Sequence, residues 1–134
     1  MSVMYDDASV RFALTPQEKI EGLKEIIKRL KKILFVYEKS LEPDSNYNYK
    51  QYLAGVLLYV QTTDSLFNGE LISILVNLES IRVNDFDKSQ TKKLVLETVN
   101  IANYLLKISQ GEEKSRGIIA TAQKTEGGDA NGGV

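Results

Sequence analysis

The chain has 134 residues, of which 43% are hydrophobic, and this length and composition suit a single domain. Its 17 basic and 18 acidic residues give a formal net charge of −1, so no overall excess of charge points to nucleic acid, an anionic membrane or an acidic substrate. Histidine and cysteine are absent, which removes the usual base at neutral pH, every thiolate nucleophile and the ligands of most zinc sites. We therefore expect a protein that is not an enzyme and that binds no cofactor and no metal.

Residues 1–15 are expected to form an N-terminal arm in front of a helical domain over residues 16–110. Asp6 and Asp7 stand where a secretory signal would be basic and then apolar, so we expect no export signal. The longest apolar runs are far shorter than the roughly 18 to 20 residues of a membrane-spanning helix. These observations predict a cytoplasmic protein without a membrane partner.

The first helix has the clearest signal. The segment Thr15-Pro16-Gln17-Glu18 has the pattern of a capping box with proline at the first helical position, so we expect the helix to begin at Pro16. Apolar residues then recur at intervals of three and four, which is typical of the seam of a helical bundle. They are Ile20, Leu23, Ile27, Leu30, Leu34, Tyr37 and Leu41. Pro43 is expected to end the helix.

Three further helices are expected. The second covers about residues 47–62, although residues 55–60 also have the composition of a buried strand, and periodicity alone does not separate the two. The third runs from residue 64 or 68 to 81, with Asn68-Gly69 as a break or a new cap. The fourth covers about residues 88–109, because Asp87 stands three residues before Gln90 in the pattern of a helix start. Four helices with short connections predict an all-α, four-helix antiparallel bundle.

Residues 111–134 are expected to form a flexible, disordered Gly-rich C-terminal tail. Six of the nine glycines lie at or after Gly111, where we expect the fourth helix to have ended. The last residues are too small and polar to bury enough apolar surface to offset the entropy of ordering them.

Charge is distributed unevenly along the chain. Residues 16–40 carry seven basic and four acidic side chains, residues 41–87 carry two and seven, and residues 88–108 carry four and one. The first and last helices of an up-and-down bundle are neighbours, so we expect them to form one basic side. Its candidate residues for binding nucleic acid or an acidic partner are Lys24, Lys28, Lys32, Lys92, Lys93, Asn100, Asn103 and Lys107.

Two interpretations of this basic side stay open. Most charged helical faces are simply solvated, and exposed ion pairs on them contribute little to stability. The alternative is a row of contacts to the phosphates of RNA or DNA, to which lysine and asparagine donate well. No zinc finger, RNP pattern or GXXG loop accompanies the lysines.

Exposed apolar and aromatic residues suggest a protein interface, although the C-terminal tail and the loop after Pro43 are the favoured covers for Phe35 and another chain is the alternative. The candidates are Phe35, Val36, Tyr47, Leu96 and Tyr104. Four tyrosines fall between residues 47 and 59, and we expect them to belong to the core with hydroxyls at its rim, except Tyr47 in the connecting loop. Asp85 and Asp87 have the spacing of a calcium loop but lack its glycine and distal glutamate, so we expect no metal there.

The sequence therefore favours a non-enzymatic small helical subunit of a larger assembly, a nucleoprotein complex contacted through the first and last helices. In size and helical composition the chain is similar to small helical subunits of nucleoprotein complexes, including those of CRISPR effectors, and it carries none of their residues as a motif. The alternative is a protein-interaction module, such as an adaptor, an immunity protein or a small chaperone. The expected partners are other protein subunits or a second copy, with RNA or DNA backbone for the first hypothesis, and no small-molecule substrate.

Overall fold

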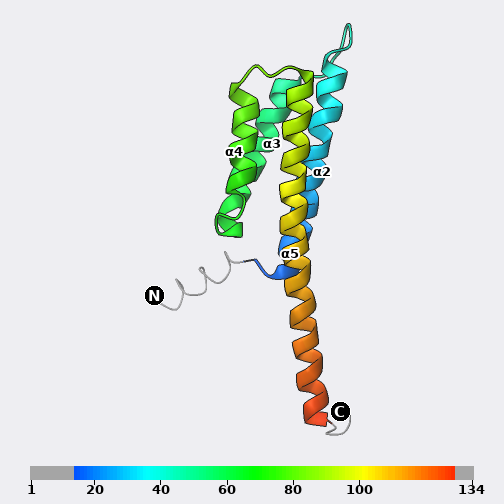
Figure 1. Ribbon diagram of the computed structural model, residues 1–134, viewed down its shortest axis with the longest axis vertical. Coiled ribbons are helices and arrows are strands. Elements are labelled where there is room, and N and C mark those ends of the chain that lie inside the picture. The colour runs from blue at the N-terminus through cyan, green and yellow to red at the C-terminus, as the bar shows by residue number, and fades with distance from the viewer. Residues whose placement is uncertain (1–13, 129–134) are drawn as a thin grey trace.

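The computed structural model describes residues 14–128, with side chains as far as Ser115. Within this range the chain forms four α helices, a short 3-10 helix and no strand (Figure 1). They are α2 (Pro16–Ser40), α3 (Tyr49–Asp64), η1 (Ser65–Phe67), α4 (Ile72–Val83) and α5 (Lys88–Gly128). The all-α class is thus confirmed, and residues 55–60 lie inside α3 rather than in a strand. The expected arm lies mostly in residues 1–13, which are outside the described residues.

Helix α2 begins where the capping box predicts. The Thr15 hydroxyl accepts a hydrogen bond from Glu18 N at 3.2 Å, and the Glu18 carboxylate accepts one from Thr15 N at 2.9 Å. These two bonds satisfy backbone donors that a helix leaves without partners at its start. The helix ends at Ser40, and the chain then turns through Pro43 and Asp44, whose φ of 57° is left-handed.

The next two helices are separated by a tight turn. Asn48 caps α3 by accepting a hydrogen bond from Gln51 N at 3.0 Å. After η1, Asn68 and Gly69 adopt left-handed φ angles of 53° and 77°, so the expected break at this dipeptide is confirmed. Helix α4 therefore starts only at Ile72, later than either start expected from the sequence.

Helix α5 differs most from its expected bounds. It begins after Asp87, whose carboxylate accepts a hydrogen bond from Gln90 N at 2.8 Å, as the sequence predicts. It then continues to Gly128, so the expected end before Gly111 is wrong. A glycine inside a helix costs only about 1 kcal/mol, and good helix formers such as Glu112 and Lys114 follow it. The tail expected over residues 111–134 stays a prediction, and residues 129–134 are outside the described residues.

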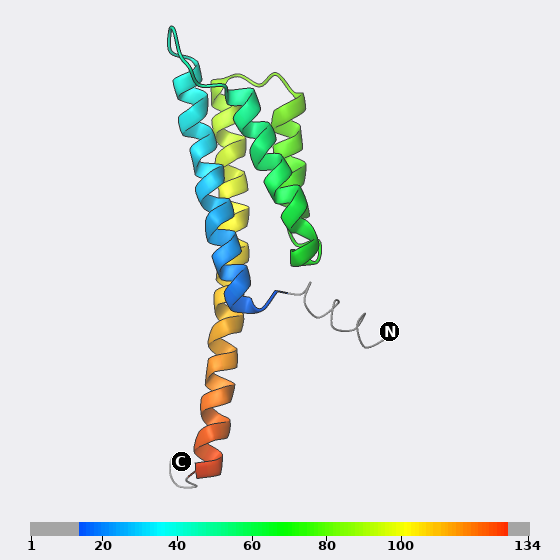
Figure 2. The same ribbon diagram turned by 180° about the vertical axis from the view of Figure 1, so that it is seen from behind.

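The helices pack as neighbours in a ring. Helix α2 contacts α5 and α3, and α4 contacts α3 and α5, with α2 and α5 sharing the most extensive interface. Figures 1 and 2 show successive helices running in opposite directions, and α5 extending well beyond the other three. Helices α2 and α5 therefore lie side by side, as expected from the sequence for the first and last helices. None of the helices in the described part combines the length and apolar character needed to cross a membrane.

One apolar core holds the four helices together. Its fully buried residues include Leu23, Ile26, Leu30, Ile33, Leu53, Val60, Phe67, Leu71, Ile74, Leu78, Val95 and Ala102. One polar link crosses it, because the buried Thr98 hydroxyl accepts a hydrogen bond from the Asn77 amide at 3.1 Å and donates one to Leu94 O at 2.7 Å. Both groups thus have partners, as buried polar groups require.

Three tyrosines of α3 pack against this core, as expected. Tyr49, Tyr52 and Tyr59 are half-buried, whereas Tyr47 in the preceding loop is exposed. The Tyr49 ring meets Tyr37 edge to face, with centroids 4.7 Å apart. Burial, and next the neighbouring Tyr37, raise the pKa of Tyr49 to about 12.

Two glycine variants test the packing of η1 on α2. A Cβ at Gly22 would stand 3.0 Å from Cζ of the buried Phe67 ring, whereas a Cβ at Gly55 would meet nothing within 4 Å. We expect Gly55→Ala to stabilise the protein by about 0.5–1 kcal/mol through its helix propensity. Gly22→Ala should be less stable than Gly55→Ala by about 1 kcal/mol or more, because Phe67 has to move. Urea unfolding of the two variants measures the difference, and equal stabilisation would contradict the packing.

The raised pKa of Tyr49 predicts a loss of stability at alkaline pH. Tyr49 stays protonated in the folded protein up to about pH 12, whereas an unfolded chain releases this proton near its model value of 10.0. The free energy of unfolding therefore decreases as the pH rises from 10.0 to about 12, because only the unfolded state releases the proton there. The stability that Tyr49 contributes is fully present below pH 10.0 and is lost over this interval. Tyr49→Phe should flatten this loss, measured as the free energy of unfolding between pH 8 and 12. A variant as alkali-sensitive as the wild type would contradict the prediction.

Candidate functional site

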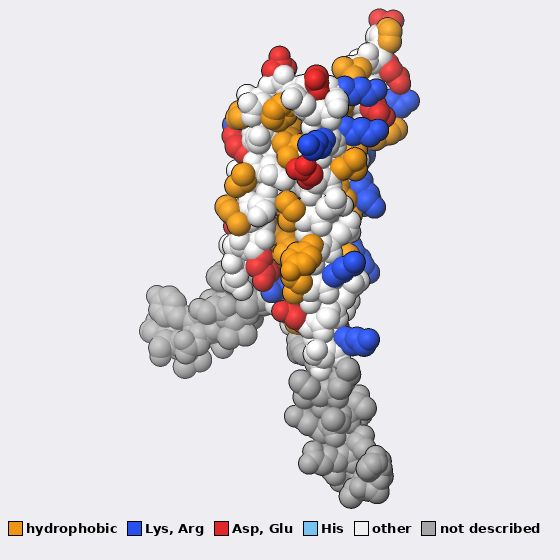
Figure 3. Space-filling view, in the orientation of Figure 1, with side chains coloured by type: hydrophobic (Ala, Val, Ile, Leu, Met, Phe, Trp, Pro, Cys, Tyr) orange, Lys and Arg blue, Asp and Glu red, His pale blue; other side chains and the backbone are white. Residues whose placement is uncertain are grey.

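Lysines and asparagines collect on the outer sides of α2 and α5. At about 100° per residue, each helix places its members of this set within an arc of about 100°, facing away from the core. We call this surface the basic face: Lys24, Lys28, Lys31 and Lys32 of α2, with Lys92, Lys93, Asn100, Asn103 and Lys107 of α5. All are exposed except the half-buried Asn103. Figure 3 shows basic side chains gathered along the side of the molecule where α2 and α5 lie.

The lysines of the basic face have no acidic partners among the described residues. The ion pairs in this part of the chain are Lys19–Glu70, Arg29–Glu25, Lys39–Glu42 and Arg82–Glu79. None of them contains a lysine of the basic face, so its positive charge is not neutralised by contacts within residues 14–115.

Two acids of α2 beside the basic face already have partners, whereas Glu97 of α5, four residues after Lys93, forms no ion pair among the described residues. Glu25 lies 2.9 Å from Arg29 Nε, and the Arg29 guanidinium stacks over the Tyr59 ring at 4.0 Å from its centroid. Glu21 accepts a hydrogen bond from the Gln17 amide at 3.1 Å. Arg29 and Glu25 therefore compensate each other at the edge of the basic face and leave its lysines to other partners.

The α5 half of the basic face includes a shallow depression. Asn100, Asn103, Tyr104 and Lys107 contribute to its lining. Amide, hydroxyl and ammonium donors are thus brought together around one concave surface. These are the groups that commonly bind phosphate oxygens without reading a base sequence.

The candidate interface residues divide into two groups. Tyr104, Leu96, Phe35 and Tyr47 are exposed, with 65%, 45%, 47% and 46% of their surface accessible. Val36 is only 4% exposed, so its assignment to an exposed interface is wrong. Asn46 and Tyr47 of the loop that follows α2 line a pocket together with Val36, which the helical spacing alone does not show.

Phe35 is partly covered by the same loop. Its ring meets Tyr47 edge to face, with centroids 5.8 Å apart and planes at 86°, and the Lys39 ammonium lies 5.7 Å from its centroid. The apolar ring on a lysine-rich face thus has a partner within the chain, although about half of its surface stays open.

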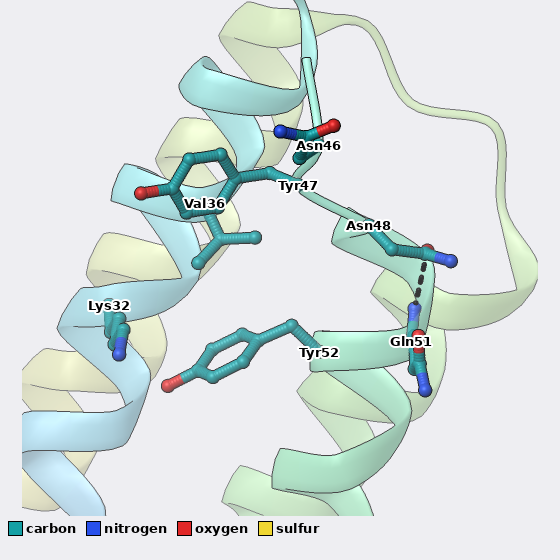
Figure 4. Close-up of a pocket in the computed structure, with 7 residues that line it drawn as sticks. All are labelled: Lys32, Val36, Asn46, Tyr47, Asn48, Gln51 and Tyr52. Atoms are coloured by element: carbon teal, nitrogen blue, oxygen red, sulfur yellow. Dashed lines mark hydrogen bonds between the residues drawn. The ribbon is translucent and has the colours of Figure 1, made fainter.

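A pocket opens between α2, this loop and the start of α3. We call it the tyrosine pocket, and it is lined by Lys32, Val36, Asn46, Tyr47, Asn48, Gln51 and Tyr52 (Figure 4). The Tyr47 and Tyr52 rings extend toward α2 from the loop and from α3, with Val36 behind them and Lys32 on the α2 wall. The pocket therefore adjoins the basic face, and the two share Lys32.

The Tyr52 hydroxyl is held in one place. It donates a hydrogen bond to Arg29 O at 3.3 Å. The pKa of Tyr52 is raised chiefly by burial and further by Glu25, while Arg29 lowers it. The hydroxyl thus stays protonated at neutral pH and keeps donating to α2.

Sequence reasoning did not bring Tyr52 and Gln51 into a site. The tyrosine cluster was the available signal, but the pocket depends on the path of residues 41–48, which spacing does not predict. Asp87, one half of the weak calcium pattern, caps α5 instead. Within the described residues, no group of three or more side chains is arranged to hold a metal ion.

Comparison of the chain with protein-family models, curated proteins and solved structures gives no significant match. The proposals that follow therefore rest on the residues, their exposure and their charges.

Proposed function

We propose that this protein is a non-enzymatic, small helical subunit of a larger assembly that binds the backbone of RNA or DNA through the basic face. In this proposal the four helices act as an antiparallel bundle in the cytoplasm, and the chain beyond residue 110, which continues α5 as far as Gly128, is a tail available to other subunits. The observation that carries the proposal is the adjacency of α2 and α5, since each of these neighbouring helices bears a row of exposed lysines.

Charge and geometry both support backbone contact. The helices that bear the basic face each have a net positive segment, while residues 49–87, which contain α3 and α4, carry five acidic and two basic residues. A polyanion approaching the molecule is therefore attracted to one side and repelled from the other. Because binding releases counterions from the phosphates, each lysine contact contributes to affinity without base specificity.

Neutralising single lysines tests this function. Lys28→Gln and Lys107→Gln should weaken binding of a fluorescent oligonucleotide of any sequence. Each should also make the slope of log affinity against log salt less negative by about 0.9 on a duplex or 0.7 on a single strand. Lys50→Gln is the matched control, because Lys50 is an exposed lysine at the start of α3, outside the basic face. Fluorescence anisotropy over a salt series gives both quantities.

Two results would overturn the backbone proposal. One is the absence of oligonucleotide binding by the wild type at low salt. The other is a salt slope that stays at the wild-type value in Lys28→Gln and Lys107→Gln. A change of the slope in Lys50→Gln as large as in those two variants would count equally against it.

A second function, protein interaction, is favoured by exposed apolar residues on α3 and α4. Leu58 on α3 is 60% exposed, and Ile72, Val76 and Val83 on α4 are 58%, 58% and 60% exposed. The three α4 residues fall within about 40° of one another around the helix. Figure 3 shows apolar side chains over α4 and where α4 meets α5. Where exposed apolar side chains form a contiguous surface, they mark interfaces with other proteins.

Surface substitutions separate this function from the first. If the α3–α4 surface joins copies of the chain, the wild type should sediment faster than a monomer at high concentration. Leu58→Lys or Val76→Lys should restore the monomer with little change in unfolding free energy, because both side chains are already exposed. Neither variant should change oligonucleotide affinity by more than a small factor. A wild type that is monomeric at every concentration would exclude self-association through this surface.

A further inference from the structure

The tyrosine pocket contains polar groups that the fold does not use. Within the described residues, no hydrogen bond is formed by the side-chain amides of Asn46 and Gln51 or by the Tyr47 hydroxyl. Lys32 forms no ion pair there, but its ammonium lies over the Tyr52 ring, 5.8 Å from the centroid. Asn48 differs, because its side-chain oxygen already caps α3. Two free amides, a hydroxyl and an ammonium therefore surround an opening with aromatic walls.

The two aromatic walls are held in place before any ligand binds. Phe35 meets the Tyr47 ring edge to face at 5.8 Å between centroids. The Tyr52 ring is fixed at its far end by the hydrogen bond of its hydroxyl to Arg29 O, at 3.3 Å. Rings that are already positioned lose little conformational entropy on binding, which favours a ligand that stacks on them.

The buried Val36 forms the apolar back of the pocket between the rings. A flat ligand placed there would lie between the Tyr47 and Tyr52 side chains, with an aliphatic group at its inner edge. Its outer edge would meet the amides of Asn46 and Gln51, which can both donate and accept hydrogen bonds. A nucleobase has this combination of flat faces and polar edges.

We propose that the tyrosine pocket binds one base of a single-stranded nucleic acid, stacked between Tyr47 and Tyr52, with a neighbouring phosphate at Lys32. This inference rests on the proposed function, which it narrows from any nucleic-acid backbone to single strands. Lys32 belongs to both the pocket and the basic face, so the backbone can continue from the pocket along the lysines of α2. In a duplex the bases are paired and stacked on one another, and none is free to enter.

Oligonucleotides that contain 2-aminopurine, a fluorescent adenine analogue, test the pocket. A single strand should bind more tightly than a duplex of the same length at equal salt, and stacking should quench the fluorescence of the analogue. Tyr47→Leu should weaken single-strand binding roughly 5- to 100-fold and abolish the quenching, with duplex affinity unchanged. Tyr47→Phe keeps the ring and is the matched control, so it should stay close to the wild type. Gln51→Leu, on an exposed side chain, gives a second, independent reduction in affinity.

The outcomes separate the two proposals. If Lys28→Gln weakens binding but Tyr47→Leu and Gln51→Leu do not, the base pocket is overturned and backbone binding stands. Equal affinity for single strand and duplex, with unquenched 2-aminopurine, also overturns the proposal of a base pocket.

If no oligonucleotide binds, binding of free adenosine monophosphate is measured instead. Ribose 5-phosphate, which has the sugar and phosphate but no base, is its control. Binding of the nucleotide alone, lost in Tyr47→Leu, would keep the base site with a free nucleotide as its ligand, and binding of neither overturns both proposals.

Discussion

The apolar contact between α2 and α5 is the constraint on which the rest of the structure depends. Leu23 and Leu30 of α2 and Val99 and Ala102 of α5 are buried in one apolar core, which holds two positively charged helices together despite their repulsion. The repulsion is weak because the lysines point into water and away from the interface, where it is screened within about 10 Å at ordinary salt. Burial of apolar surface in the interface is a larger and shorter-range effect. The same packing therefore stabilises the fold and creates the basic face.

Local signals predict most of the helix starts. The Thr15 and Asp87 caps depend on side chains within three residues of the helix start, so spacing along the sequence is sufficient to find them. The three- and four-residue apolar repeat likewise predicts which side of α2 is buried. These features depend on short-range geometry, which is the same in any helix. The exposed lysines of the basic face could be found in this way.

Features that depend on contacts between distant parts of the chain are harder to predict from the sequence. Val36 lies near the edge of the lysine-rich side of α2 by its spacing, yet it is buried, and it lines a pocket together with residues of the loop after Ser40. The tyrosine pocket arises from the same loop, because it brings Tyr47 beside Phe35 while α3 presents Tyr52. The end of α5 was misplaced for the opposite reason. Gly111 was read as a stop, but a glycine that keeps helical geometry removes little stability when helix-forming residues follow.

The length of α5 has a mechanical consequence. At a rise of 1.5 Å per residue, its 41 residues make a continuous rod about 60 Å long, and α2, with 25 residues, runs beside only part of it. An attachment near Gly128 would take its direction and its distance from the four-helix core from α5. Inserting one residue in the unsupported part would turn that attachment by about 100° around the axis, whereas inserting seven would nearly restore its direction and move it about 10 Å farther out.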